Sequence, residues 1–318
     1  MDPKAASSME GLHAPAPDPF WQESWYFNFA DAGAEVFGLC RIGMRPGKGR
    51  ADGLALCSVK GAPVLLYPAL GLGISGPGVR LREPEDLCTK KLRFACEKPM
   101  TSWRLTLSGA KAGFELSWQA MTPVFVFPSP SAGEGKSAAR DHYEQAGKVS
   151  GTLRLGGERV AINGMGQRDH SWGPRNWAGV GAWTWISAQF DRGFAFNYWS
   201  VGTGSEKTAG GFFADEEEAV AVTEGEVSFD GDEKGRRHRG GRLRLALADG
   251  RIKNIRFTQR AFWPLYKDGA LIFENFGTFF CEEASGVGVT EVLRRSRLGP
   301  IPMLRYAPGF ARLAVLSR

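Results

Sequence analysis

The sequence predicts an all-β protein built from short antiparallel strands. Apolar and polar residues alternate with period two, and the 318 residues include 42 glycines, 10 tryptophans and 21 phenylalanines. Such alternation is typical of strands with one buried face, and the glycines between them are typical of turns. No segment shows the period of a long amphipathic helix. About eight strands are expected in each half, enough for two barrels or for a barrel and a sandwich.

Strands are expected along both halves of the chain, joined as hairpins by turns such as Asp191–Gly193. The clearest strands of the first half are Trp21–Phe29, Leu92–Glu97, Trp103–Leu107 and Phe114–Gln119. The strands of the second half are Lys148–Leu155, Arg159–Asn163, Val180–Phe190, Gly193–Trp199, Ala219–Phe229, Gly241–Leu247, Arg251–Gln259, Ala270–Phe280 and Gly288–Leu293.

The order of the chain predicts four segments. Residues 1–19, rich in Ala, Ser, Pro and Asp, are expected to be a disordered tail. Residues 20–135 would form a first β domain that ends in a linker at PSPSAGEGK, Pro128–Lys136. Residues 136–300 would form a second β domain. Residues 301–318 belong to a basic and apolar tail, which would be a strap across a barrel or a contact with a membrane surface.

Composition excludes several classes of function. The net charge of +6 is dispersed, and the basic run Lys234–Arg244 has no interleaved aromatic residue, so no nucleic-acid partner is expected. No run approaches the ~18 apolar residues of a membrane span. Five cysteines without metal-binding spacing, and the lack of a secretory segment, predict reduced thiols and a cytoplasmic protein.

The most unusual segment is GMGQRDHSWGPRNW, Gly164–Trp177, which combines arginines, a carboxylate, an imidazole and two indoles. Buried charge is costly unless it is paired, so we expect a polar cluster under an aromatic lid at the wall of a cavity. The alternative is an Arg–Asp pair with a stacked Trp that closes the bottom of a barrel. A second polar and aromatic group is Asp141–Gly147. Glu23 lies among aromatic residues and is interpreted as a member of an ion pair rather than a functional acid.

Motifs of several enzyme classes are missing. GLGISGPG, residues 71–78, lacks GxGxxG spacing and a following helix, and GxSxG is absent. His170 and Ser171 are adjacent and would point to opposite faces of a strand. No cofactor and no metal are therefore expected, and acid–base chemistry in an aromatic pocket remains. Asp169 among indoles would be held protonated by desolvation, whereas pairing with Arg168 would leave His170 as the better candidate.

These residues resemble the signature of a known family. GMGQRDHSWGPRNW is similar to the G-x-RDHSWG-x-R-x-W signature of two-domain proteins related to carotenoid 1,2-hydratase (hydroxyneurosporene synthase). DHYEQAGKVSG, ENFGTFF and GVGVTEV are also similar to that group. The resemblance implies two lipocalin-like antiparallel β-barrel or sandwich domains packed side by side, with a site near their junction. It also implies cofactor-free addition of water to an alkene of an apolar, isoprenoid-like substrate. Lipocalin-like pericyclases of polyketide pathways look like remoter relatives of the same architecture.

The resemblance, with the strands that follow the motif, supplies the candidate site residues. The catalytic candidates are Asp169, His170 and Glu144. The substrate-binding candidates are His142, Arg168, Trp172, Arg175, Trp177, Trp183, Asn197 and Trp199. In this hypothesis Asp169 donates the proton, while His170 orients it or activates water. Trp172 would shield the site, and the two arginines would pair with Glu144 or other carboxylates.

Two functions are compatible with these expectations. The first is a cofactor-free hydratase or dehydratase, cyclase or isomerase of a terpenoid-like lipid, a lyase or isomerase in enzyme class. The second is a non-catalytic, lipocalin-like carrier of an apolar ligand. The two polar clusters favour the enzyme, because a carrier needs at most one polar anchor. A cytoplasmic location with peripheral contact at the inner face of the membrane, through the C-terminal tail, is expected in either case.

Overall fold

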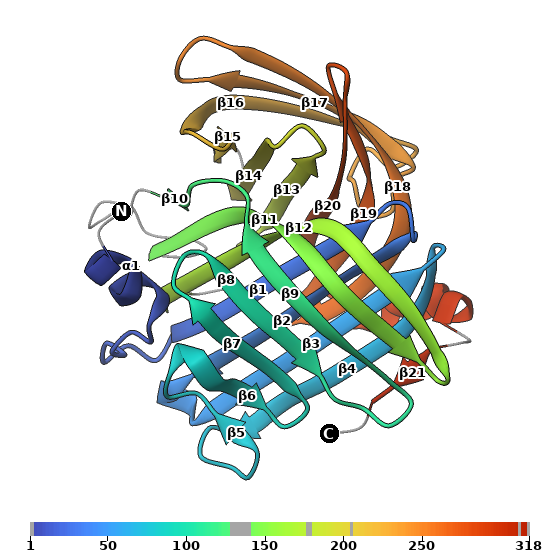
Figure 1. Ribbon diagram of the computed structural model, residues 1–318. Helices are drawn as coiled ribbons and strands as arrows, with labels where there is room; N and C mark the ends of the chain where they lie inside the picture. Colours follow the sequence, from blue (N-terminus) through green and yellow to red (C-terminus); the bar gives the residue numbers. More distant parts are fainter. Residues whose placement is uncertain (1–2, 128–140, 176–179, 204–205, 311–312, 317–318) are drawn as a thin grey trace.

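The computed structural model contains a curled open sheet and a closed barrel, which lie against each other (Figure 1). The two assemblies confirm the predicted all-β fold of two packed β domains. The structure describes residues 3–127, 141–175, 180–203, 206–310 and 313–316.

The curled sheet has 13 strands, most of them from the first half of the chain. They are β1 (Trp21–Asp31), β2 (Val36–Arg45), β3 (Arg50–Val59), β4 (Ala62–Gly73), β5 (Val79–Arg80), β6 (Leu87–Thr89), β7 (Leu92–Lys98), β8 (Ser102–Leu107), β9 (Ala112–Ala120), β10 (Phe125–Val126), β11 (Asp141–Leu155), β12 (Glu158–Pro174) and β21 (Ala314–Val315). Their order is β21-β4-β3-β2-β1-β12-β11-β9-β8-β7-β6-β5, and β10 pairs with β11. The pairs are antiparallel except β21 with β4.

The barrel closes eight consecutive antiparallel strands, because β20 pairs with β13. Its strands are β13 (Ala182–Phe190), β14 (Ala195–Thr203), β15 (Glu206–Ala214), β16 (Ala219–Asp230), β17 (Gly240–Leu247), β18 (Ile252–Lys267), β19 (Ala270–Cys281) and β20 (Ala284–Arg295). The helical segments are short. They are α1 (Pro3–Glu10), η1 (Pro46–Lys48), η2 (Pro84–Asp86) and η4 (Ile301–Phe310).

Period-two alternation gives each assembly an apolar core of its own. On β1, Trp25, Phe27 and Phe29 point to the inner face of the curled sheet and are almost completely buried. In the barrel, Ile186 of β13 and Phe196 of β14 belong to a core that fills the interior. Large apolar side chains on alternate strand positions therefore form the cores of both assemblies, as the sequence pattern predicted.

A further core joins the two assemblies. On the curled sheet, Phe37 and Leu39 of β2 point to the face opposite the inner one, here called the barrel-facing face. They pack against Trp185 of β13, Trp263 of β18 and Phe276 of β19. Part of the space between the assemblies is therefore filled by an apolar core, which buries the second face of these strands. The remainder of that space is the cavity described below.

The assemblies divide the chain at a different place from the expected boundary at residues 135 and 136. Strands β11 and β12 hydrogen-bond to β9 and β1, so they belong to the curled sheet. The change of assembly lies between β12 and β13. The expected linker, Pro128–Lys136, lies outside the described residues. Beyond the barrel, η4 leads toward β21, which adds to the edge of the curled sheet beside β4.

The N-terminal residues also differ from the expected disordered tail over residues 1–19. Residues Pro3–Glu10 form α1, and the carboxylate of Glu10 is completely buried. It accepts hydrogen bonds from Arg168, 2.6 Å away, and from the Tyr143 hydroxyl, 2.7 Å away. Composition could not reveal this contact, because Arg168 lies 158 residues away in the sequence.

All five cysteines are buried and free, in keeping with the expected reduced thiols. Among the described residues, no helix is long and apolar enough to cross a membrane.

Candidate functional site

Strand β12 divides the RDHSW motif between two sites. Consecutive side chains on a strand point to opposite faces. Asp169 and Ser171 therefore point to the barrel-facing side, where they line a cavity. Arg168, His170 and Trp172 point to the inner face of the curled sheet, where they contact residues of its core.

The cavity lies between the curled sheet and the barrel and has a volume of about 1800 Å³. It exceeds the roughly 300–1,000 Å³ of common small-ligand pockets, so it has room for a long ligand. Apolar side chains from β2, β3 and β4 line one wall. The opposite wall carries the indoles of Trp183, Trp185 and Trp199. An apolar body with several aromatic contacts fits this lining.

Glu144 of β11 is the most deeply buried carboxyl group of the cavity, with 1% of the residue exposed. Its Oε1 accepts a hydrogen bond from Trp185 Nε1 at 3.0 Å, and its Oε2 accepts one from Gln167 Nε2 at 2.9 Å. Burial, and secondly the charge of Asp169, raise the pKa of Glu144 well above its ordinary value. The hydrogen bonds from Trp185 and Gln167 oppose this shift and fix the orientation of the carboxyl group, so burial favours its neutral form.

His142 and Asp169 complete a group around Glu144. Asp169 is the cross-strand partner of Glu144, and its Oδ1 accepts a hydrogen bond from Ser171 at 2.7 Å. The His142 imidazole stacks on Phe127 with ring centres 4.0 Å apart, and its Nε2 lies 3.8 Å from Glu144 Oε1. Burial lowers the pKa of His142 to about 4, so the ring is neutral at pH 7.

The barrel supplies a second pair of carboxyl groups to the cavity. Glu274 of β19 and Glu291 of β20 are cross-strand partners and share a hydrogen bond. Burial, and secondly the neighbouring Glu291, raise the pKa of Glu274 well above its ordinary value. Tyr26 of β1 also lines the cavity, and burial raises the pKa of its hydroxyl. Burial thus favours the neutral form of several carboxyl groups of the cavity.

The sequence prediction missed Glu274, Glu291 and Tyr26. A signal was present for the two glutamates, because they lie in the ENFGTFF and GVGVTEV segments that carried the family resemblance. Glu274 follows Ile272 by two positions and precedes Phe276 by two, so it interrupts an apolar strand face. A charged residue at such a position indicates a site or a buried partner.

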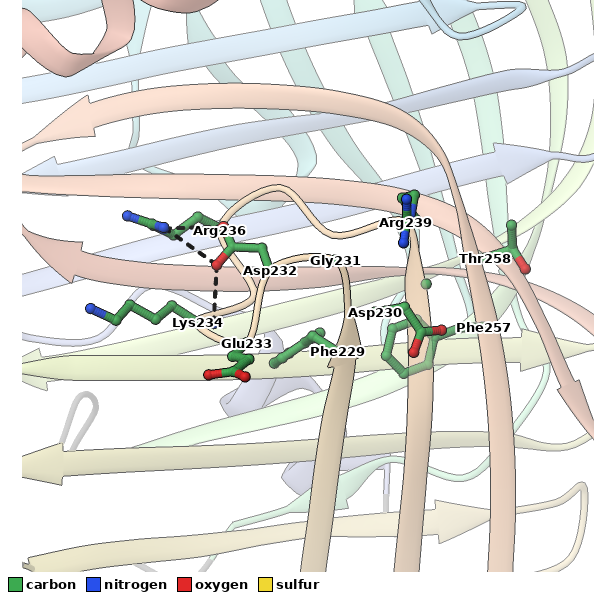
Figure 2. Close-up of a pocket in the computed structure, with 11 residues that line it drawn as sticks. Phe229, Asp230, Gly231, Asp232, Glu233, Lys234, Arg236, Arg239, Phe257 and Thr258 are labelled. Atoms are coloured by element: carbon green, nitrogen blue, oxygen red, sulfur yellow. Dashed lines mark hydrogen bonds and ion pairs between the residues drawn. The ribbon is translucent and has the colours of Figure 1, made fainter.

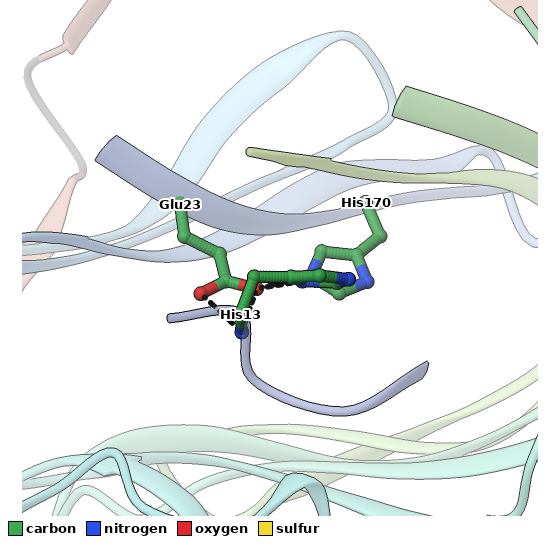
Figure 3. Close-up of side chains that lie close together, drawn as sticks. All are labelled: His13, Glu23 and His170. Carbon is green, nitrogen blue, oxygen red and sulfur yellow. Dashed lines mark hydrogen bonds and ion pairs between the residues drawn. The ribbon is translucent and has the colours of Figure 1, made fainter. Parts of the chain in front are cut away.

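On the inner face of the curled sheet, Glu23 accepts hydrogen bonds from two histidines (Figure 3). Its Oε1 lies 2.8 Å from His13 Nδ1 and 2.9 Å from His170 Nε2. Burial alone would raise the pKa of Glu23, but the hydrogen bonds from His13 and His170 outweigh it and hold the pKa below its ordinary value. His13 also stacks on Trp172 with ring centres 3.7 Å apart. Glu23 is thus paired, as expected.

Arg168 is enclosed by partners on the same inner face. It forms an ion pair with Glu10 at 2.6 Å, and its Nε and Nη2 donate to Gln145 Oε1 at 3.0 and 2.8 Å. The guanidinium also lies over the rings of Trp118 and Tyr143. The expected partners of Arg168, Asp169 or Glu144, lie on the opposite face of the sheet. This face therefore carries a satisfied structural network.

The candidate residues of the sequence are thus distributed over several places. The cavity is lined by Glu144, Asp169, His142, Arg175, Trp183 and Trp199. The inner face holds Arg168, His170 and Trp172. Asn197 of β14 is completely buried and is not among the residues that line the cavity. Trp177 lies outside the described residues.

Two groups of described residues have ligand atoms close enough to hold a metal ion. In each group, His13, Glu23 and His170 or His142, Glu144 and Asp169, these atoms lie within 4.8 Å of one another. In the first group both imidazoles already hydrogen-bond to Glu23. In the second, Glu144 and Asp169 accept hydrogen bonds from neighbouring side chains, while His142 Nε2 lies 3.8 Å from Glu144 Oε1. The carboxyl groups of both clusters thus already have hydrogen-bond donors from the chain.

A second hollow lies at the turn between β16 and β17 (Figure 2). Within it, Asp232 accepts hydrogen bonds from Arg236 Nε at 3.1 Å and from the Lys234 backbone N–H at 3.1 Å. It is an open hollow of about 870 Å³, and no candidate site residue lines it. The candidate site is therefore the cavity between the assemblies.

Comparisons with known proteins agree with this architecture. A family model described as a domain of unknown function (DUF7064) matches residues 6–296. No curated protein matches the sequence.

Several solved structures share the fold. An AttH-like protein of Nitrosomonas europaea is 15% identical, with a TM-score of 0.63 over 88% of this chain and 94% of that one. CghA, solved with Sch210972, is 13% identical, with a TM-score of 0.63 over 87% and 89%. Kievitone hydratase of Nectria haematococca is 13% identical, with a TM-score of 0.62 over 91% of each chain. These likenesses confirm the expected fold resemblance to lipocalin-like hydratases.

Proposed function

The chain belongs to the DUF7064 family, and from this premise we propose that it is a cofactor-free acid–base enzyme with an apolar, terpenoid-like substrate. The substrate would occupy the cavity between the curled sheet and the barrel. The reaction would be a hydration or dehydration, a cyclisation or an isomerisation. The observation that carries the proposal is Glu144, a buried carboxyl group with a raised pKa, held by two hydrogen-bond donors at the wall of a large cavity.

Glu144 suits the role of proton donor better than Asp169, the donor expected from the sequence. A donor must keep its proton near neutral pH, and burial gives Glu144 that property. In a hydration, Glu144 gives its proton to an alkene carbon, and the π electrons form the new C–H bond. The carboxylate that remains is stabilised by the N–H groups of Trp185 and Gln167.

The other cavity residues have roles in the same reaction. The indoles of Trp183, Trp185 and Trp199 line the cavity, and the π face of an indole can stabilise a developing carbocation. Water then adds to the cation and loses a proton to Asp169. Proton exchange between Asp169 and its cross-strand partner Glu144 restores the donor. Without the water, loss of a proton or attack by a second alkene gives an isomer or a ring.

The comparisons support this reaction class without defining it. One protein of the same fold is by name a hydratase, and another was solved with the small molecule Sch210972. The carrier remains the alternative, because the apolar lining would also hold a ligand that undergoes no reaction. Two buried carboxyl pairs favour the enzyme, since burial of such groups costs stability and carriage alone does not require them.

Turnover of a Glu144→Gln variant tests the proposal. The protein is incubated with a bacterial lipid extract, and mass spectrometry follows products that have gained or lost water or changed retention at constant mass. The amide keeps the shape of the side chain but cannot donate the proton, so turnover should fall by about 10²–10⁴-fold. The control is Glu115→Gln, an exposed glutamate on β9. Unchanged turnover in Glu144→Gln would contradict the proposed donor, and absence of any product would favour the carrier.

We also propose that the cavity receives its substrate from an anionic lipid surface. Pro300 and Met303 line the cavity, and the adjacent Ile301 and Leu304 are exposed by 61% and 71%. Exposed basic residues such as Arg305 lie in the same segment. Apolar side chains beside arginines favour contact with anionic headgroups.

Vesicle flotation tests this contact. Wild-type protein should float with phosphatidylglycerol vesicles and less with phosphatidylcholine vesicles. An Ile301→Ser/Leu304→Ser variant should lose the interaction. Equal flotation of variant and wild type would contradict the proposed surface.

A further inference from the structure

Arg175, the residue after β12, is a buried cation without an ion pair among the described residues. Its exposed fraction is 7%, it lines the cavity, and its Nε and Nη2 have no hydrogen-bond partner among the described residues. The backbone is held firmly: its N–H donates to the Phe20 carbonyl at 3.0 Å, and its carbonyl accepts from Gln22 Nε2 at 3.0 Å. The position of Arg175 is therefore fixed by its backbone, and its guanidinium remains available.

The charge of Arg175 persists at neutral pH. Burial lowers its pKa to about 10, and the field of Asp169 opposes that shift. Among the described residues, Arg175 and Asp169 form no ion pair. The hydrogen bond that Asp169 Oδ1 accepts comes from Ser171. A buried guanidinium without an ion pair is costly. Such a residue is typical of a binding site whose ligand supplies the missing charge.

The free atoms of Arg175 specify the shape of that ligand group. Nε and Nη2 form one edge of the planar guanidinium, and their two N–H groups match the two oxygens of a carboxylate. Arg41 of β2 also lines the cavity, and its positive charge contributes to the lowered pKa of Arg175. Two cations thus act on the same region of the cavity.

We infer that the ligand of this cavity is an apolar molecule with a carboxylate, which binds side-on to Arg175 with Arg41 nearby. The inference rests on the proposed function, because it assumes that the cavity is the ligand site. A fatty or terpenoid carboxylic acid has the required chemistry. Its carboxylate would lie at the free edge of Arg175, while its apolar body would extend along the leucines and indoles of the cavity walls.

Binding of dodecanoate and of methyl dodecanoate tests the inference. The two probes share the apolar body and differ in the anionic group, and indole fluorescence reports on both because Trp183, Trp185 and Trp199 line the cavity. Wild-type protein should bind the acid roughly 10- to 100-fold more tightly than the ester, the usual effect of hydrogen bonds to a charged group. Arg175→Gln should abolish this preference and leave the affinity for the ester nearly unchanged. The control Arg192→Gln, an exposed arginine on the barrel, should keep the preference.

The melting temperature of Arg175→Gln shows whether a change in its binding comes from a loss of folded structure. Since Arg175 has no ion pair among the described residues, Arg175→Gln should melt at the wild-type temperature or above. Equal affinity of the wild-type protein for the acid and the ester would overturn this inference and leave the proposed function standing. An equal loss of affinity for both probes in Arg175→Gln would also overturn it. Failure of both probes to bind wild-type protein would overturn it together with the apolar cavity. Glu144→Gln should retain the preference for the acid, so the carboxylate site and the proton donor are tested separately.

Discussion

The two faces of β12 bury polar residues in different ways. On the inner face of the curled sheet, Arg168 has a carboxylate and an amide oxygen as partners, and His170 bonds to Glu23 and Tyr143. On the barrel-facing side, Arg175 Nε and Nη2 have no partner among the described residues, and burial raises the pKa of Glu144 next to Asp169. The charged groups of the first face are paired by the protein itself, although the indole N–H groups of Trp25, Trp103 and Trp118 have no partner among the described residues, whereas the charged groups of the second face are paired only in part.

This difference separates residues that maintain the fold from residues that bind or react. A buried polar group stabilises a protein when its partners come from the chain, and costs stability when they do not. Selection for stability alone would remove Arg175 and the two carboxyl pairs. Their presence around one cavity therefore indicates a ligand, although the sequence motif spans both faces without distinction.

The largest expected effect concerns the satisfied face. Arg168→Met leaves the Glu10 carboxylate buried without its cation, so the free energy of unfolding should fall by about 3–5 kcal/mol. Urea denaturation of the wild type and the variant measures the change. Glu10→Leu/Arg168→Met removes both charges and should recover much of the loss. A loss below about 1 kcal/mol in the single variant would show that Arg168 does not have the structural role assigned to it.

The sequence predicted the fold well because strand alternation and glycine turns are local properties. Of the eleven candidate site residues, six line the cavity: His142, Glu144, Asp169, Arg175, Trp183 and Trp199. The sequence prediction grouped His170 with Asp169, although adjacent strand residues point apart. The partner of Arg168 was beyond prediction, because Glu10 lies in a segment whose composition resembles disorder and reaches the core only in the tertiary structure.

A smaller effect concerns the pH dependence of stability. The pKa of His142 is lowered from 6.5 to about 4 by burial, so the unfolded chain binds the proton more readily. Above pH 6.5 the group is neutral in both states and has no effect. As the pH falls from 6.5 to 4, it should cost up to roughly 3 kcal/mol of stability. His142→Gln should therefore lose less stability than the wild type between pH 7.5 and 4.5 in urea titrations. Parallel curves would contradict the burial of a neutral imidazole in the cavity.

The smallest effect is expected for Asp169→Asn. In the structure Asp169 pairs with neither Arg168 nor Arg175 directly, and the amide oxygen can still accept the hydrogen bond from Ser171. The free energy of unfolding should change by less than about 1 kcal/mol, the usual worth of one hydrogen bond. Arg168 is the neighbour of Asp169 on β12. The difference between the losses of unfolding free energy in Arg168→Met and Asp169→Asn therefore measures the contrast between the two faces. A loss as large as that of Arg168→Met would mean that Asp169 is also a structural partner.

The protonation state of Glu144 is the most direct test of the account, and it requires no substrate. Infrared difference spectroscopy at neutral pH compares the wild type with Glu144→Gln, and Glu115→Gln serves as the exposed control. The account predicts the carbonyl stretching band of a protonated carboxylic acid in the wild type, absent from Glu144→Gln and retained in the control. If Glu144→Gln instead removes the bands of an ionised carboxylate, Glu144 is not a neutral acid and cannot be the proton donor of this cavity.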